Sequence, residues 1–165
     1  MGYTTDFIGE FTITPALTQE QIAYLQLFNK TRRMCRSSSS ASELPDPLRE
    51  AVGLPIGDEA EFFVGGTGWA GQDNDKSVVE HNNPPKNQPG LWCQWTPSDD
   101  GATLGWDGGE KFYDYVEWLA YIDENFLNRW GRTLSGIVSW QGEQDDDYGM
   151  ITAGEVGIHT LPRVK

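Results

Sequence analysis

Residues 110–131 read EKFYDYVEWLAYIDENFLNRWG, and this stretch decides the fold. Its apolar residues recur at intervals of three and four, the spacing that places them on one side of an α-helix. They are Phe112, Tyr115, Val116, Leu119, Ile122, Phe126 and Trp130. Gly131 is the residue type that most often ends a helix in the left-handed conformation. The pattern therefore predicts a long helix that is introduced by residues 107–110 and ends at Gly131.

Alternating apolar residues predict β-strands on both sides of this helix. The expected strands are 7–13, 61–64, 134–140, 148–152 and 155–159, with a hairpin made of 91–96 and 102–106. A capping box at 18–21 predicts a second helix, with Ile22, Leu25 and Phe28 facing inward. Tight turns between the late strands require antiparallel pairing. The order predicts an α+β fold, an antiparallel sheet with two amphipathic helices packed on one face.

The length of 165 residues predicts a single α+β domain over 1–165. A run of serines and two prolines predict a mobile surface loop at 35–47, with a short helical turn directly after it. Residues 65–90 are rich in Gly and Pro and predict a long loop, which in a compact domain is commonly functional.

The chain carries 25 acidic against 12 basic residues, a formal net charge of −13. Such a field repels nucleic-acid phosphates and anionic membranes and attracts basic protein surfaces. We therefore expect a protein partner with a basic surface, no direct contact with nucleic acid and no membrane association. The sequence begins without a secretion signal and contains no apolar run of spanning length, which predicts a cytoplasmic location. Cys35 and Cys93 fit reduced thiols best, although one bridge stays open.

No pattern of catalytic or metal-binding residues emerges from the spacing. The G-x-G-x-x-G match at 66–71 is not followed by a helix, so a flexible loop is the better interpretation. Asp73, Asp75 and His81 match neither a zinc pattern nor the calcium loop, and the carboxylates of 143–147 are typical of a solvated turn. We expect no catalytic residue, no metal site and no cofactor.

Aromatic residues give the strongest hint of a binding surface. Five tryptophans fall on expected strands or loops: Trp69, Trp92, Trp95, Trp106 and Trp140. If Cys93 and Trp95 face the helices, Trp92 and Gln94 face outward. A second packed layer made by the long loop is the equally favoured alternative. The candidate ligand- or partner-binding residues are Trp69, Asp73, Asp75, His81, Trp92, Gln94, Trp140, Gln141 and Glu143.

Three motifs give the chain a resemblance to a known group: GLWCQW at 90–95, EKFYDYVEWL at 110–119 and SWQGE at 139–143. On these motifs the chain resembles a group of small bacterial and phage-borne proteins to which no activity is assigned. The resemblance runs through most of the chain and includes residues 31–34 and 65–71. The resemblance implies a bacterial or viral cytosolic protein and transfers no catalytic residue. The serine run at 37–40 and the tail after Val156 differ from that group.

Together these features favour a non-enzymatic, acidic interaction protein that binds and inhibits a protein partner. A phage counter-defence role, an immunity-type role or DNA mimicry would each fit. The alternative is a small-molecule-binding protein or enzyme with a site under the 65–95 loop, lined by Trp69, His81, Trp92 and Trp140. A structural module without a separable site is a third interpretation.

Overall fold

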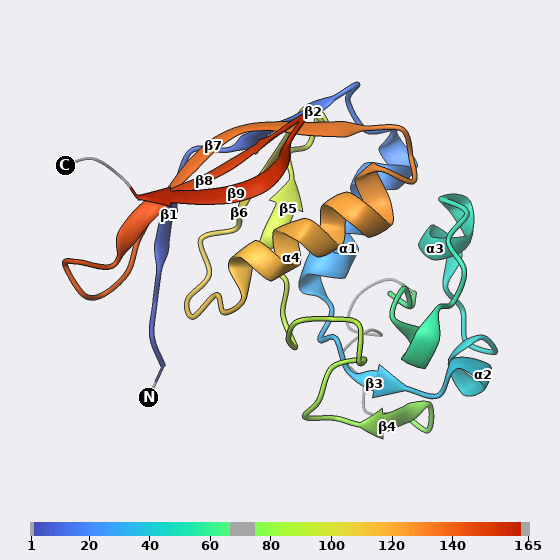
Figure 1. The fold of residues 1–165 in the computed structure, drawn as a ribbon. Helices are drawn as coiled ribbons and strands as arrows, with labels where there is room; N and C mark the ends of the chain where they lie inside the picture. Colours follow the sequence, from blue (N-terminus) through green and yellow to red (C-terminus); the bar gives the residue numbers. More distant parts are fainter. Residues whose placement is uncertain (1, 67–74, 163–165) are drawn as a thin grey trace. The chain divides into compact units, whose positions relative to one another are not determined.

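The computed structural model describes residues 2–66 and 75–162 (Figure 1). The chain divides into two compact units. The first unit consists of Met1–Thr18 together with Gln94–Lys165, and the second consists of Gln19–Cys93. The predicted α+β class, with an antiparallel sheet and helices, is confirmed. Among the described residues, no helix combines the length and the apolar character needed to cross a bilayer.

An antiparallel sheet forms the first unit. Its strands follow the order β5-β6-β2-β7-β8-β9, and β1 also pairs with β7. They are β1 (Asp6–Ile8), β2 (Phe11–Thr14), β5 (Trp95–Pro97), β6 (Thr103–Trp106), β7 (Thr133–Gln141), β8 (Tyr148–Gly154) and β9 (Gly157–Pro162). The predicted hairpin and the late meander are therefore confirmed, with shifted ends.

The first predicted strand is broken into β1 and β2. Both pair with β7, with Ile8 opposite Ser139 and Thr12 opposite Ser135. The break falls at Gly9, whose φ of 100° suits glycine and disfavours residues with a side chain. The predicted alternation persists across the break, because Phe7 and Phe11 are buried whereas Ile8 is exposed.

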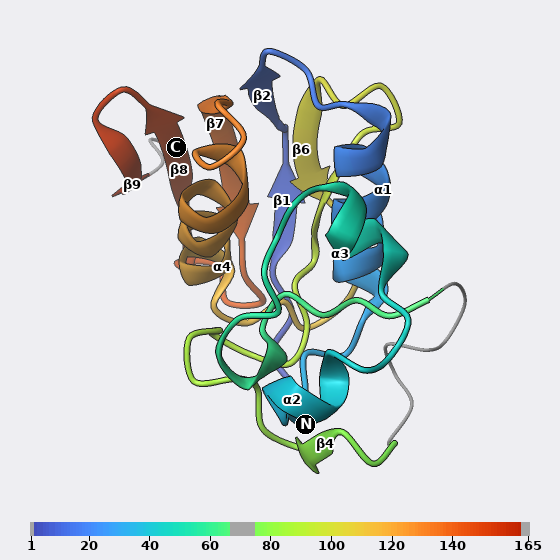
Figure 2. The same ribbon diagram turned by 90° about the vertical axis from the view of Figure 1, so that its right-hand side faces the viewer.

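Helix α4 (Tyr115–Ile122) lies against one face of this sheet (Figure 2). It begins after Phe112, the first predicted inward position, because Lys111 and Asp114 adopt left-handed backbone conformations that cannot continue a helix. It continues into a π-helical turn, η3 (Asp123–Leu127). Gly131 has a φ of 71°, which confirms its predicted role in ending the helical segment.

The core of the first unit is built around the ring of Phe7. Edge-on contacts with centroid separations of 4.9–5.8 Å join it to Tyr115, Trp95, Trp106 and Phe112. Such geometry brings the positive edge of one ring to the negative face of another. Trp95 also donates from Nε1 to the backbone oxygen of Tyr115 at 2.8 Å, so the ring cluster fixes the start of α4.

The second unit contains short elements joined by irregular backbone. They are α1 (Gln19–Lys30), β3 (Cys35–Arg36), α2 (Ser38–Ala41), α3 (Pro47–Ala51), the 3₁₀ turn η1 (Asp58–Ala60) and β4 (Val78–Glu80). Strands β3 and β4 pair antiparallel. The predicted inward positions of α1, Ile22, Leu25 and Phe28, are buried. Cys35 and Cys93 are buried free thiols.

Three sequence predictions in this unit need correction. Residues 35–47 are not a continuous loop, because they form β3 and α2, and the Ser37 hydroxyl accepts from the Ser40 backbone N–H at the start of α2. The predicted strand at 61–64 is absent and the chain turns there instead. The predicted loop at 65–90 contains β4, while 67–74 lie outside the described residues.

Buried arginines hold the irregular backbone of the second unit. Arg33 Nη2 donates to the backbone oxygen of Glu61 at 2.7 Å, and Gln88 Nε2 donates to the same oxygen at 2.6 Å. Arg36 donates to Ser77 Oγ at 2.8 Å and pairs with Asp75 at 3.1 Å. These bonds satisfy hydrogen-bonding groups, among them the Glu61 backbone oxygen, in segments that have no strand partner. They explain why 61–64 does not need a sheet.

Asp46 and Arg49 form a buried ion pair in this unit. Arg49 Nε donates to Asp46 Oδ2 at 2.6 Å, and the other carboxylate oxygen accepts from the backbone N–H groups of Val64 and Gly65. The Asp46 side chain is fully buried. One carboxylate therefore joins α3 to the chain at 64–65.

We predict that Asp46→Ala lowers the free energy of unfolding by about 3 kcal/mol or more, because it leaves the Arg49 charge and two backbone donors without their acceptor. Urea unfolding measures the change. Glu50→Ala on the exposed side of α3 is the matched control and should stay within about 0.5 kcal/mol of wild type. Equal losses in the two variants would contradict this role of Asp46.

Candidate functional site

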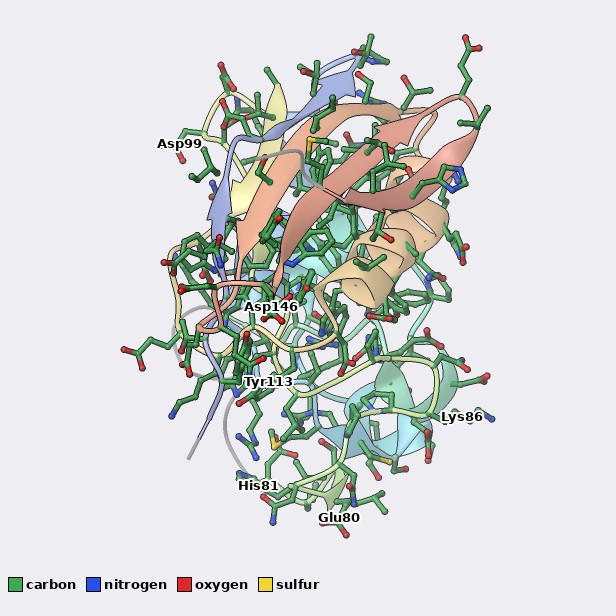
Figure 3. The ribbon with its side chains drawn as sticks, turned by 60° about the vertical axis from the view of Figure 1, so that its left-hand side comes forward. Glu80, His81, Lys86, Asp99, Tyr113 and Asp146 are labelled. Carbon is green, nitrogen blue, oxygen red and sulfur yellow. The ribbon has the colours of Figure 1, made fainter. Side chains whose placement is uncertain are left out.

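No hydrogen bond or ion pair joins the described candidate residues of the second unit to one another, and Asp75 has a structural role. Asp75 pairs with Arg36 and accepts from the Ser77 backbone N–H at 2.8 Å. The backbone oxygen of His81 accepts from Arg32 Nε at 3.1 Å, and Figure 3 shows the His81 and Glu80 side chains pointing away from β4. Trp92 is 37% exposed. Trp69 and Asp73 lie outside the described residues.

Gln94 belongs to the first unit and is bonded within it. Its Oε1 accepts from Trp106 Nε1 at 3.1 Å, and its Nε2 donates to the backbone oxygen of Glu110 at 2.8 Å. The side chain is half-buried, so the prediction that Gln94 faces outward is only partly right. Its bonds hold the loop after β6 in place.

Trp140, Gln141 and Glu143 are the candidates that the structure brings together, at the turn between β7 and β8. The Asp147 carboxylate is the centre of this turn. Its Oδ1 accepts from Trp140 Nε1 at 3.1 Å, and its Oδ2 accepts from the Tyr3 hydroxyl at 2.6 Å. The ring of Trp140 lies 6.1 Å from that of Tyr115, which links the turn to the aromatic core.

The backbone of this turn is closed by its own hydrogen bonds. The Gly142 N–H donates to the Asp147 oxygen at 2.7 Å, and the Asp147 N–H donates to the Gln144 oxygen at 3.0 Å. Gln141 Nε2 also donates to the Gln144 and Asp147 oxygens at 3.1 and 3.2 Å. These bonds satisfy the backbone groups at the base of the turn from within the chain itself.

The N-terminal segment is attached to the same turn. The Thr4 N–H donates to Glu143 Oε1 at 2.8 Å, and the Gln144 N–H donates to the Tyr3 hydroxyl at 3.2 Å. The Tyr3 N–H in turn donates to the Tyr113 hydroxyl at 3.0 Å. Residues that are more than 100 positions apart in the sequence thus share one network.

The network leaves a set of carboxylates and a tyrosine facing solvent. Asp6, Glu143, Asp145 and Asp146 are exposed, and Tyr113 is 52% exposed. Figure 3 shows Tyr113 and Asp146 on the same side of the first unit. We call the set of Asp6, Tyr113, Glu143, Asp145 and Asp146 the acidic turn surface. Its carboxylates make no ion pair with a described residue.

Negative charge at the turn changes the acidity of two tyrosines. The hydrogen bond that Tyr3 donates to Asp147 raises the pKa of the Tyr3 hydroxyl. Burial, together with the charges of Asp147 and Glu117, raises the pKa of Tyr115. Both hydroxyls therefore stay protonated at neutral pH, which lets Tyr3 remain a donor to the carboxylate.

Sequence reasoning missed Tyr3, Tyr113 and Asp147. It interpreted 143–147 as an ordinary solvated turn, whereas Asp147 is half-buried and bonded. The only local signals are two glycines, Gly142 and Gly149, which flank the turn. A Cβ at 142 would overlap the Asp147 carboxylate and the Tyr3 hydroxyl, and a Cβ at 149 would overlap the Trp140 ring. Their role is visible only once the side chains are placed.

No group of three or more His, Cys, Asp or Glu residues is arranged to hold a metal ion within 2–66 and 75–162. Comparison of the chain with protein-family models, with curated proteins and with solved structures finds no match.

We predict that Gly149→Ala lowers the free energy of unfolding by about 1–3 kcal/mol, because the added methyl group forces the Trp140 ring out of its place over β8. Thermal and urea unfolding measure the loss. Gly154→Ala, on the same strand with open space around the new methyl group, is the matched control. Its stability should stay within about 0.5 kcal/mol of wild type. A Gly149→Ala protein as stable as this control would show that the ring does not need the glycine.

Proposed function

We propose that this chain is an acidic interaction protein that binds a basic protein partner through the acidic turn surface. The observation that carries the proposal is the contrast within one turn. Asp147 is fixed by Tyr3 and Trp140, whereas Glu143, Asp145 and Asp146 face solvent without a cation. Charges of one sign are thus displayed on a turn that is fixed by internal bonds.

Long-range attraction favours a basic partner. The net charge of −13 gives the molecule a field that accelerates encounter with positive surfaces and slows encounter with negative ones. Unpaired exposed carboxylates add to this field locally, since no cation of the described residues neutralises them. The attraction must weaken with salt, because exposed charges are screened over about 8 Å at physiological ionic strength.

Preorganisation favours binding at this place over other acidic parts of the surface. A turn that is ordered before binding loses less conformational entropy when a partner docks. Tyr113 adds an exposed ring next to the carboxylates, and tyrosine is enriched at protein interfaces. The combination of an aromatic ring with fixed carboxylates suits lysine- and arginine-rich surfaces.

The exposed carboxylates of the acidic turn surface carry the same sign of charge as phosphate groups. A basic surface that normally binds phosphates could therefore bind these carboxylates instead. Occupation of that surface would exclude its usual ligand, so inhibition of the partner follows from binding alone. DNA mimicry and a counter-defence or immunity-type role are specific versions of this proposal.

The test uses the full chain and the peptide (Arg-Gly)5 as a stand-in for a basic partner, with NMR and calorimetric titration at low salt. The peptide should shift the signals of 143–147 and Tyr113. The double variant Asp145→Asn/Asp146→Asn should bind about fivefold more weakly, as expected for two charge contacts of about 0.5 kcal/mol each.

The matched control is Asp99→Asn/Glu50→Gln, which removes the same net charge from exposed positions elsewhere. Figure 3 shows Asp99 well apart from Asp146 on the first unit. The control should bind within about twofold of wild type. Equal weakening in both double variants, or equal binding of a peptide with citrulline in place of arginine, would overturn the proposal.

A further inference from the structure

A half-open cleft lies in the first unit, at the other end of β8 from the acidic turn surface. Its volume is about 530 Å³, within the range of small-molecule sites. Three segments line it: the π-helical turn η3 and the residue after it, the beginning of β7, and the turn between β8 and β9. The lining residues are Asp123, Asn128, Thr133, Leu134, Ser135, Gly154, Glu155 and Gly157.

The π-helical turn and the residue after it contribute Asp123 and Asn128 to the lining of the cleft. The Asn128 N–H donates to the Asp123 backbone oxygen at 2.8 Å, a bond that spans five residues and widens the helix. Such turns are uncommon and are frequently found at functional sites. The two residues joined by this bond are both lining residues of the cleft.

The polar side chains of the cleft have little to bind within the protein. In the described part of the chain, the carboxylates of Asp123 and Glu155, the Asn128 amide and the Ser135 hydroxyl take part in no side-chain hydrogen bond or ion pair. Asp123 is half-buried, and burial, with the charge of Glu124, raises the pKa of its carboxyl. Asn128, Ser135 and Glu155 are exposed, so Asp123 is the lining group that burial leaves partly desolvated. Such a carboxylate without a partner is costly unless something satisfies it.

We propose that this cleft binds an organic cation, with the ammonium or guanidinium group held by the carboxylates of Asp123 and Glu155. No lining residue is basic, so both carboxylates can act on the ligand. The Asn128 amide supplies a further acceptor. A forked guanidinium can share its donors between two carboxylates, which favours an alkylguanidine.

This chemistry has two sources, a free amine or guanidine and an arginine or lysine side chain of a protein. The site is independent of the acidic turn surface, because the two lie at opposite ends of β8 and share no residue. A failure of one proposal therefore leaves the other intact.

The test titrates the full chain with agmatine, with the peptide acetyl-Gly-Arg-Gly-amide and with Ca²⁺, followed by NMR and calorimetry. Agmatine should bind and shift the signals of Asp123, Asn128, Ser135 and Glu155. Tighter binding of the peptide than of agmatine would identify a side chain as the natural ligand, and the reverse order would identify a free amine. Both outcomes support the proposal.

Asp123→Asn should weaken binding of agmatine about tenfold or more, as expected for the loss of a half-buried charged hydrogen-bond partner. Glu155→Gln should weaken it about two- to fivefold, as expected for an exposed charge. Asp99→Asn is the charge-matched control and should leave binding unchanged. Glu155 lies in an exposed turn, so its variant tests the site even if Asp123→Asn alters folding.

Three results would overturn the proposal. The first is an absence of binding by both agmatine and the peptide. The second is equal weakening in Asp99→Asn, which would indicate attraction by the overall charge. The third is saturable binding of Ca²⁺ at these residues without binding of either guanidine, which would identify a metal site instead.

Discussion

The hydrogen bonds accepted by the Asp147 carboxylate are the interaction on which the proposed function depends. One oxygen binds Trp140 and the other binds Tyr3, so a single side chain joins the end of β7, the start of β8 and the N-terminal segment. The Trp140 ring packs near the Tyr115 ring, and Tyr115 in turn contacts Phe7 in the aromatic core. The acidic turn is therefore anchored to the core of the first unit. A hydrogen bond to an ionised group is stronger than a neutral one, which suits this anchoring role.

The parts of the fold that depend on local pattern could be predicted from the sequence. Alternation along 7–13 and 134–140 identified the strands that pair, and Gly131 identified the end of the helical segment. These signals are local because a strand buries every second residue and a helix ends where the backbone turns left-handed. Trp140, Gln141 and Glu143 lie together for the related reason that they follow one another at the end of a strand.

The parts of the fold and of the candidate site that the sequence did not predict depend on contacts between residues far apart in the chain. The sequence suggests a strand at 61–64, but Arg33 and Gln88 take the Glu61 carbonyl that a sheet would have used. Arg33 belongs to a residue type that is mostly exposed, yet here it is buried. Nothing near Tyr3 indicates that its hydroxyl meets Asp147, 144 residues away. The Asp123 cleft likewise requires a π-helical turn that helical spacing alone does not predict.

The central claim is that the acidic turn is ordered before any partner binds, and amide hydrogen exchange of the free protein at low salt tests it most directly. We expect the amides of Thr4, Gly142, Gln144 and Asp147 to exchange well below the rate of an unstructured peptide, since each donates to an acceptor in the network. Exchange of these four amides at the unstructured rate, with the neighbouring amides of β7 and β8 protected, would contradict the claim. The turn would then be ordered only by its partner.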